Sequence, residues 1–473
     1  MNHSTPEPTP RDRVSQAELR HSLLLIALAW GVFGTLYVNT VMGAPFAAFA
    51  RKLGATTLLY GIMCSLPSLG ALAQIPGAYI VERIRRRKAL FLYSLLIGRA
   101  AWLVAAALPW LFGETGRRVA GLMSVVFVAS VLTNLGSPGW LSWFGDVVPQ
   151  RIRGAYIGVR ARLATLMGMV AAVAAGWALD FNSHYWMYAL VFGLAAVTGL
   201  ADPLLLFGVR EPRMTVAEHA PRLVTIALGP LRDRTFRRYL AYAASAAVCY
   251  GIFGPFAWLY ALEYLRLGKL GANLYLMVLP MLAMTAVFPL WGRTVDRYGC
   301  RPTLAVAWMG LLVFPAAWFF ATPGHTWWLA GVGLVVGGFL AGAQVAEFDL
   351  MFSMTPVAQR SVYVASVAVV SGLFAAGAPA MGGALAQALK GVHVPLWGMT
   401  ITNLHVLLLI SLALRIAHIL YFVPRLPETR AEPAMRLALD LLRAPFGALA
   451  ARLTWPDWAP RSRAPDRKPP EDV

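Results

Sequence analysis

The sequence predicts an all-α polytopic membrane protein whose twelve transmembrane helices form two pseudo-symmetric six-helix bundles. The composition, a succession of long apolar runs and a repeat at half length predict this fold. Of the 473 residues, 58% are hydrophobic and 13% are charged, whereas ordinary soluble domains carry about 25% charged residues. So little charge cannot cover that much apolar surface in water. A lipid bilayer is therefore an expected partner.

The apolar runs are long enough to cross a bilayer. The run "LLLIALAWGVFGTLYVNTVMGAPFAAFA" (residues 23–50) exceeds the roughly 20 residues that a spanning helix needs. Such runs recur along the chain, and helices satisfy their own backbone hydrogen bonds in lipid. We expect twelve spans, centred near residues 33, 67, 101, 132, 168, 197, 252, 284, 312, 340, 375 and 411. The polar, Pro-rich first 20 residues do not resemble a removable signal peptide.

The distribution of basic residues predicts the orientation. With both termini in the cytoplasm, 32 of the 41 Lys and Arg residues fall inside and 7 outside, while Arg99 and Arg415 lie within spans. This bias follows the positive-inside rule and predicts a multi-pass protein of the cytoplasmic (inner) membrane. The net charge of +19 then comes from membrane-flanking loops, so no nucleic-acid partner is expected. The three scattered cysteines predict neither a disulfide framework nor a metal cluster.

The predicted domain organisation follows from these spans. The five segments are a cytoplasmic N-terminal segment (1–20), an N-terminal six-helix bundle (21–209), a cytoplasmic central loop (210–238), a C-terminal six-helix bundle (239–424) and a cytoplasmic amphipathic or disordered tail (425–473).

The two halves repeat short sequences in the same order. "WGVFG" (30–34) matches "YGIFG" (250–254), "KLGA" (52–55) recurs at 269–272, and "PQRIRGAY" (149–156) matches "PVAQRSVY" (356–363). Parallel six-helix repeats are typical of transporters that bind a substrate between their halves near the bilayer midplane. The repeat therefore predicts a transporter.

One loop carries a family resemblance. "GRTVDRYGCRPTL" (292–304) resembles the loop signature of the major facilitator superfamily, and the resemblance extends over residues 20–424. It implies a gating loop that holds the halves together in the outward-open state. Its expected residues are Gly292, Asp296, Arg297, Gly299 and Arg301, with Glu82 and Arg83 in the first half.

The resemblance also implies roles for these loop residues. Gly292 would allow two helices to approach closely, and Asp296 would accept hydrogen bonds from helix-start amides and pair with an arginine. The first-half loop "VERIRRRKAL" (81–90) departs from the pattern, with Ala78 and Arg85 at glycine positions. The alternative for this loop is that its basic residues only fix the orientation of the neighbouring helices in the membrane.

In this family, spans 1, 4, 7 and 10 line the central cavity, which implies a set of substrate-binding candidates. They are Tyr37, Asn39, Asn134, Trp143, Tyr250, Trp258, Gln344 and Glu347. Amides and aromatic rings suit a neutral, hydroxylated or amphipathic ligand, because they supply hydrogen bonds and flat apolar faces. Ordinary helix packing is the alternative for the aromatic residues, and interhelical hydrogen bonding for the asparagines.

Glu347 and Asp349 are the candidates for proton coupling. They lie two residues apart, so they point to different faces of a helix. Desolvation disfavours the charged form of a carboxylate, and a carboxylate in such surroundings could carry a proton during transport. Solvation at the membrane surface is the alternative.

The other charged residues near the spans have structural expectations. Asp146 is expected to join the loop that contains Arg151 and Arg153, while Asp180 and Glu263 are expected to be solvated. Arg99 and Arg415 are each expected to form a structural ion pair with an acidic residue or to snorkel. Binding of a substrate anion is the alternative. The glycines of span 10, at 333, 337, 338 and 342, have spacing typical of close helix packing.

These features predict a secondary active transporter that moves a small organic solute by alternating access and is not an enzyme. The sequence contains no nucleotide-binding loop of the G-x-x-x-x-G-K type and no nucleophile–base pair. No metal and no cofactor are expected, apart from a proton gradient, and the protein is expected to be monomeric. A non-transporting membrane sensor or a scaffold with the same fold remains the alternative.

Overall fold

The computed structural model describes residues 16–212, 232–355, 360–396, 399–427 and residue 437. Predictions for residues 1–15, for most of the central loop and for nearly all of the tail lie outside the described residues. Within the described residues, twelve helical stretches are long and apolar enough to cross a membrane. Each of the twelve expected span centres falls inside one of them, so the span count and fold class are confirmed.

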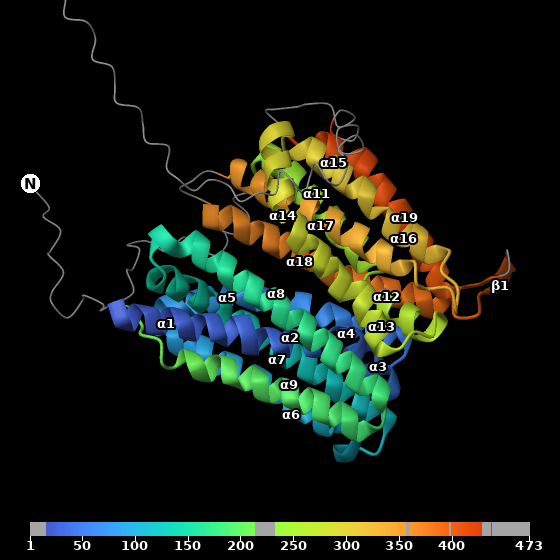
Figure 1. Cartoon of the computed structure of the whole chain (residues 1–473), viewed down its shortest axis with the longest axis horizontal. Coiled ribbons are helices and arrows are strands. Elements are labelled where there is room, and N and C mark those ends of the chain that lie inside the picture. Colours follow the sequence, from blue (N-terminus) through green and yellow to red (C-terminus); the bar gives the residue numbers. More distant parts are fainter. Residues whose placement is uncertain (1–15, 213–231, 356–359, 397–398, 428–436, 438–473) are drawn as a thin grey trace, which may run out of the picture.

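The N-terminal bundle contains the first six spans (Figure 1). Its first span is interrupted by a π-helical turn at Ala29–Gly34, which separates its first two helices. The bundle consists of α1 (Gln16–Leu28), α2 (Thr35–Thr40), α3 (Gly43–Lys52), α4 (Thr57–Gly70), α5 (Gln74–Ile84), α6 (Arg87–Leu111), α7 (Thr115–Val147), α8 (Gln150–Phe181) and α9 (Tyr185–Leu206).

The C-terminal bundle contains the other six spans, several of which are again interrupted by π-helical turns. The bundle consists of α11 (Arg234–Gly251), α12 (Phe256–Leu259), α13 (Lys269–Asn273), α14 (Leu279–Tyr298), α15 (Cys300–Leu311), α16 (Val313–Phe319), α17 (Leu329–Ser353), α18 (Arg360–Ala388) and α19 (Asn403–Ala417).

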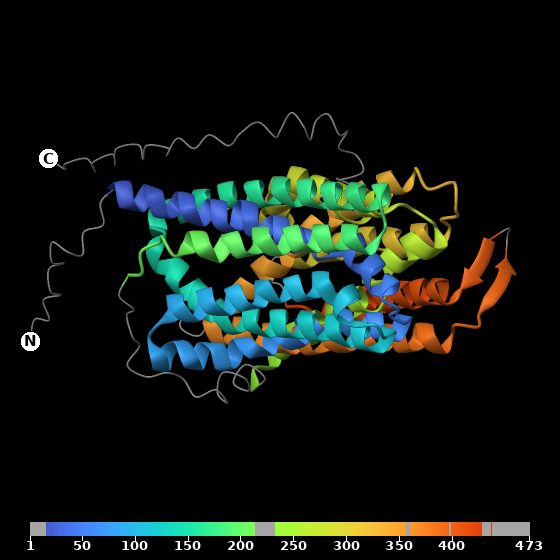
Figure 2. The same cartoon turned by 90° about the horizontal axis from the view of Figure 1, so that it is seen from below.

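A short hairpin departs from the all-helical expectation. Strands β1 (His393–Leu396) and β2 (Met399–Thr402) pair antiparallel between the last two spans, with His393 opposite Thr402. Val, Thr and Ile in these strands favour extended backbone. The hairpin projects beyond the helices at one end of the molecule (Figure 2).

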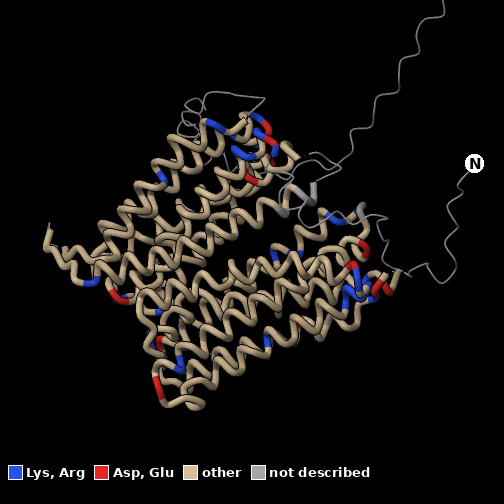
Figure 3. Tube along the Cα trace, turned by 180° about the vertical axis from the view of Figure 1, so that it is seen from behind, with Lys and Arg blue, Asp and Glu red and all other residues tan. Residues whose placement is uncertain are grey.

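The two bundles lie side by side along a common axis and diverge toward one end (Figures 1 and 2). We call the end with β1 and β2 the hairpin end. We call the other the basic end, because Lys and Arg gather in its connections between α5 and α6 and between α14 and α15 (Figure 3). Across the bundles α4 packs against α18, and α8 packs against α13. These contacts join span 2 to span 11 and span 5 to span 8. The six-span repeat relates span 2 to span 8 and span 5 to span 11, so the two contacts are equivalent.

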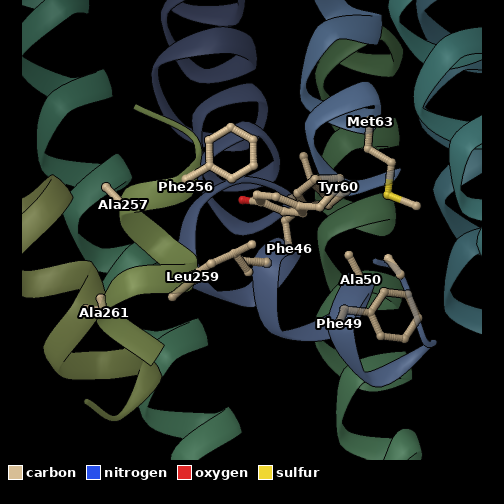
Figure 4. Close-up of a cluster of buried hydrophobic side chains, with 14 of the residues drawn as sticks. Phe46, Phe49, Ala50, Tyr60, Met63, Phe256, Ala257, Leu259 and Ala261 are labelled. Carbon is tan, nitrogen blue, oxygen red and sulfur yellow. The ribbon is translucent and has the colours of Figure 1, made fainter. Parts of the chain in front are cut away.

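Aromatic side chains pack where the bundles meet. Tyr60 of α4 lies between Phe46 of α3 and Phe256 of α12, with ring centroids 6.1 and 6.0 Å away (Figure 4). The Tyr60 hydroxyl also donates to the carbonyl of Pro255 at 3.2 Å. This cross-bundle cluster is buried, so it excludes water from the hairpin-end half of the interface.

Glycines bring α17 close to α14, as their spacing predicts. A Cβ at Gly337 would collide with the backbone of Pro280, and one at Gly333 would lie 2.7 Å from the carbonyl oxygen of Tyr275. Gly342 packs against Trp291. Gly338 differs, because nothing lies within 4 Å of its Cβ position.

We expect Gly337→Ala to lower the thermal stability of the purified protein, because the backbones of α14 and α17 must separate. Overpacking of this kind costs about 1–3 kcal/mol. Gly338→Ala is the matched control and should leave the melting temperature nearly unchanged. Equal stability of the two variants would contradict this packing.

Candidate functional site

A central cavity of about 430 Å³ lies between the bundles. Residues of α2, α3, α4, α6 and α7 line it from one bundle, and Gly254, Pro255 and Trp258 line it from the other. Three predicted substrate-binding residues, Tyr37, Asn134 and Trp258, meet there. Span 10 was expected to line this cavity, but none of its residues is among the described residues that do so. Instead, α17 packs against α14 and α15 of its own bundle.

Two smaller cavities adjoin the central one. A cavity of about 330 Å³ inside the N-terminal bundle shares Tyr37, Val38, Thr133 and Asn134 with it. A cavity of about 180 Å³ inside the C-terminal bundle shares Gly254 and Trp258 with it. The three cavities therefore form a row across the molecule, with Tyr37 and Trp258 at the two junctions.

Arg99 forms a buried ion pair in the N-terminal bundle. Its Nη2 lies 2.5 Å from Oδ2 of Asp202 on α9, and both side chains are 2% exposed. The guanidinium also lies over the ring of Tyr37, 4.6 Å from its centroid. The pair joins spans 3 and 6. Asp202 was not selected from the sequence, although an acid inside an apolar run is itself a signal.

A second arginine enters the same cavity. Arg160 lies on α8 and lines the N-terminal cavity with Arg99 and Asp202. Its guanidinium lies 5.3 Å from the ring centroids of both Trp140 and Phe144. Arg160 was not selected from the sequence as a candidate site residue. It lies in the first third of α8, which begins at Gln150.

Arg415 is the buried cation of the C-terminal bundle. It is 3% exposed and lines the C-terminal cavity with Tyr250. Its guanidinium lies 5.3 Å from the Tyr250 ring centroid and 5.9 Å from that of Trp308. Its Nη1 donates to the carbonyl of Leu311 at 3.3 Å. No acidic side chain among the described residues lies within ion-pair distance of Arg415.

Glu347 belongs to a chain of polar side chains within the C-terminal bundle. Its Oε1 accepts a hydrogen bond from the Tyr242 hydroxyl at 2.8 Å, and that hydroxyl accepts one from the Trp308 indole at 2.7 Å. The His418 ring contacts that of Trp308 at a tilt of 48°, and its Nδ1 lies 2.9 Å from the hydroxyl of Ser245. No cation among the described residues forms an ion pair with Glu347.

The remaining predicted residues lie elsewhere. Asn39 donates to the carbonyl of Thr35 on its own helix and packs against α8. Trp143 is fully buried near the basic end, where its indole donates to the carbonyl of Arg210. Gln344 is exposed. Asp349 is also exposed and accepts a contact from Sγ of Cys300 at 3.1 Å, beside the expected gating loop.

The first-half loop contains a buried arginine. Arg87 is 1% exposed, and its Nη1 lies 2.6 Å from Oδ2 of Asp146. The expected grouping of Asp146 with Arg151 and Arg153 is therefore wrong, and Arg153 instead donates to the Gly145 and Val148 carbonyls. Arg87 can reach Asp146 because α6 begins at Arg87 itself. Glu82 and Arg83 are exposed.

Two charged residues of the second-half loop are exposed. They are Asp296 and Arg297, and none of the ion pairs among the described residues includes Asp296. Gly299 has a φ of 93°, which ends α14 and allows α15 to begin at once. Nothing lies within 4 Å of the Gly292 Cβ position. The expected close approach at Gly292 is absent here, because the bundles diverge at this end (Figure 1).

In the first half, the close approach occurs at Gly77 instead. A Cβ there would collide with the backbone carbonyl of Leu135 on α7. Ala78, one residue further along, occupies the position of the family's glycine. In the second-half loop, Arg301 is the second residue of α15 and is partly buried.

Acidic residues join the bundles at the hairpin end. Arg51 forms a two-nitrogen ion pair with Glu263, at 2.5 and 2.9 Å. Asp180 of α8 accepts hydrogen bonds from the backbone amides of Lys269 and Leu270, at 2.7 and 2.9 Å. Asp180 thus caps the first turn of α13 in the opposite bundle. Both acids are partly exposed, as expected, but their cross-bundle role was missed because sequence alone does not pair distant loops.

Asn273 adds a buried contact between the bundles. Its side-chain amide donates to the carbonyl of Ala172 at 2.7 Å, and its Oδ1 accepts from the backbone amide of Ala44 at 3.1 Å. Among the described residues, no group of three or more His, Cys, Asp or Glu side chains could hold a metal ion.

Two six-helix bundles around a shared cavity define a polytopic membrane transporter of the two-bundle type. A model of the Major Facilitator Superfamily matches residues 22–356. The chain belongs to this superfamily and is a transporter rather than an enzyme.

Curated relatives match only in part. Solute carrier family 2, facilitated glucose transporter member 12, from Macaca fascicularis is 24% identical over 210 residues, which cover 44% of this chain and 31% of that protein. The Homo sapiens protein of the same name is 24% identical over 172 residues, covering 36% of this chain and 26% of that protein. The match thus spans about a third or less of these relatives.

Solved structures are similar over nearly the whole fold. The nucleoside transporter NupG superposes with a TM-score of 0.64 at 12% identity, covering 86% of this chain and 98% of that one. A D-xylose-proton symporter gives a TM-score of 0.64 at 16% identity, covering 88% and 99%. At these identities the likeness concerns the fold alone.

Proposed function

We propose that the protein is a secondary active transporter that moves a small organic solute across the cytoplasmic membrane by alternating access. The single observation that carries this proposal is the uneven contact between the bundles. Hydrogen bonds and ion pairs gather in the hairpin-end half of the interface, while the bundles diverge at the basic end (Figure 1). The named solutes of the solved relatives, nucleosides and D-xylose, support a small organic substrate.

The conformation corresponds to one end of the transport cycle. By the positive-inside rule, the basic end faces the cytoplasm and both termini lie there. The central cavity is then accessible from the cytoplasm and closed by Tyr60, Asn273 and the Arg51–Glu263 pair on the other side. The exposed Asp296 fits this state, because the gating loop would hold the halves together only when the basic end closes.

Proton coupling is the second part of the proposal, and Glu347 is its carrier. A partly buried carboxylate without a cationic partner gains little from being charged. The hydrogen bond from Tyr242 keeps the carboxylate in place in the bundle. A membrane sensor or scaffold is the alternative, and it would require that no solute be moved by the reconstituted protein.

We expect Asp180→Ala to shift the population toward states that are open at the hairpin end. Loss of the cap on α13 costs about 1 kcal/mol, which changes the ratio of two conformations about fivefold. Cys64 is a natural reporter because it lines the central cavity. In a Cys249→Ser, Cys300→Ser background, a membrane-impermeant maleimide added on the hairpin side should label Cys64 about fivefold faster in the variant.

Glu114→Ala is the matched control. Glu114 is an acid at the same end, but it pairs with Arg117 on its own helix. This variant should leave the labelling rate of Cys64 unchanged. Equal rates in the Asp180 and Glu114 variants would contradict the gating role of Asp180, and no labelling from either side in any variant would contradict alternating access.

A further inference from the structure

The cavity inside the N-terminal bundle contains more cationic groups than it needs for its ion pair. Arg99 uses only Nη2 to reach Asp202. Its Nε and Nη1 are buried and have no hydrogen-bond partner among the described residues, and the same holds for Nε of Arg160. Arg99 is 2% exposed. Buried donors are normally satisfied in folded proteins, so these three nitrogens indicate a missing acceptor.

The net charge of the cavity indicates the charge of that acceptor. Arg99, Arg160 and Asp202 all line it. Two guanidinium groups and one carboxylate leave a single formal positive charge. A monoanion would neutralise it, whereas the Asp202 carboxylate would repel the second charge of a dianion. Guanidinium groups bind carboxylates with directed, charge-assisted hydrogen bonds.

The remaining wall indicates the body of the ligand. The aromatic residues Trp30, Phe91 and Trp140 line one part of the cavity, while Thr133, Asn134 and Ser137 supply small polar groups. The volume of about 330 Å³ is at the lower end of the range for small-molecule sites. Tyr37 and Asn134 also line the central cavity, so a bound molecule could extend from one cavity into the other.

We propose that this cavity binds the carboxylate of a monoanionic organic solute with an apolar or aromatic body, held by the unpartnered Nη1 of Arg99 and by Nε of Arg160. The inference rests on the proposed function, because it assigns the substrate class of the same transporter. The apolar body contacts Trp30 and Trp140, and Tyr37 borders its path to the central cavity. Arg99 has two roles, since Nη2 holds Asp202 while Nη1 is left for the ligand.

Binding of carboxylates and of their neutral amides to the purified full-length protein tests the proposal. The probes are benzoate, phenylacetate and 3-phenylpropionate, each beside its amide, with inorganic phosphate as a dianion. A ligand of the folded state raises the melting temperature by mass action. At least one carboxylate should raise it in a saturable way, while its amide and phosphate should not. Binding of phosphate alone, or equal binding of acid and amide, would overturn the proposal.

Three variants locate the site. Arg160→Gln leaves the Arg99–Asp202 pair intact and should weaken carboxylate binding about tenfold or more. Arg99→Lys retains a cation beside Asp202 but lacks the free Nε and Nη1, so it should fold and also bind weakly. Arg415→Gln removes the buried arginine of the other bundle and should bind as the unmodified protein does. Unchanged binding in the first two variants, or loss only in the third, would refute this site.

Reconstituted vesicles separate this inference from the proposed function. Exchange of radiolabelled phenylacetate is compared between proteoliposomes and protein-free liposomes. Carboxylate binding without protein-dependent exchange would sustain the site and contradict transport. Protein-dependent exchange of D-xylose or uridine, with no carboxylate binding, would sustain transport and overturn the anion site.

Discussion

Arg99→Ala is expected to reduce the yield of folded protein sharply and to lower its melting temperature on the order of 10 °C. The substitution leaves the Asp202 carboxylate buried without its partner at 2% exposure. Removing one member of a buried ion pair costs about 3–5 kcal/mol, because an uncompensated charge stays in a low-dielectric interior. Thermal denaturation in detergent, followed by size-exclusion chromatography, measures the effect.

Two further variants make this result specific. The double variant Arg99→Met, Asp202→Leu removes both charges and should recover most of the lost stability. Arg117→Ala removes an exposed arginine that pairs within one helix and should have little effect. A well-folded Arg99→Ala protein that has lost only its affinity for a solute would show that the pair has no structural role.

Glu347→Gln is expected to abolish solute accumulation driven by a pH gradient. Glutamine keeps an acceptor for the Tyr242 hydroxyl, which lies 2.8 Å from the carboxylate, so the bundle should stay folded. It cannot bind and release a proton, so the gradient can no longer drive the solute. Solute exchange at equal pH on both sides should persist. Uptake of the tightest-binding solute into proteoliposomes, with and without an imposed gradient, measures both quantities.

Asp349→Asn is the matched control for Glu347. Asp349 lies two residues further along α17, but it is exposed and contacts Cys300 near the basic end. Its amide variant should accumulate solute normally. Loss of accumulation in this variant alone would transfer the proton-carrying role to Asp349, and normal accumulation in both variants would contradict proton coupling through either acid.

The spans and their grouping could be predicted from the sequence because they depend on composition and local pattern. Each span is a run of apolar residues long enough to cross a membrane, and the half-length repeat divides the runs into two bundles. The hairpin at 393–402 was missed, because a strand of four residues gives too short a pattern within a connection.

The candidate site could be predicted only in part. Tyr37, Asn134 and Trp258 meet at the central cavity because spans 1, 4 and 7 are central in the family. The pairing of Arg99 with Asp202, 103 residues away, depends on how spans 3 and 6 rotate about their axes. Sequence periodicity does not determine that rotation when a helix is apolar on every side. The same reason explains why Asp180 was not recognised as a cap for α13.

Distances between spin labels at the two ends of the bundles test alternating access most directly. In a cysteine-free background, one label pair at Ile152 and Arg238 reports on the basic end, and another at Glu114 and His325 reports on the hairpin end. All four positions are exposed. Addition of a bound solute should shorten part of the basic-end distribution and lengthen part of the hairpin-end distribution together. One fixed distance at each end, in every condition, would contradict a transporter that works by alternating access.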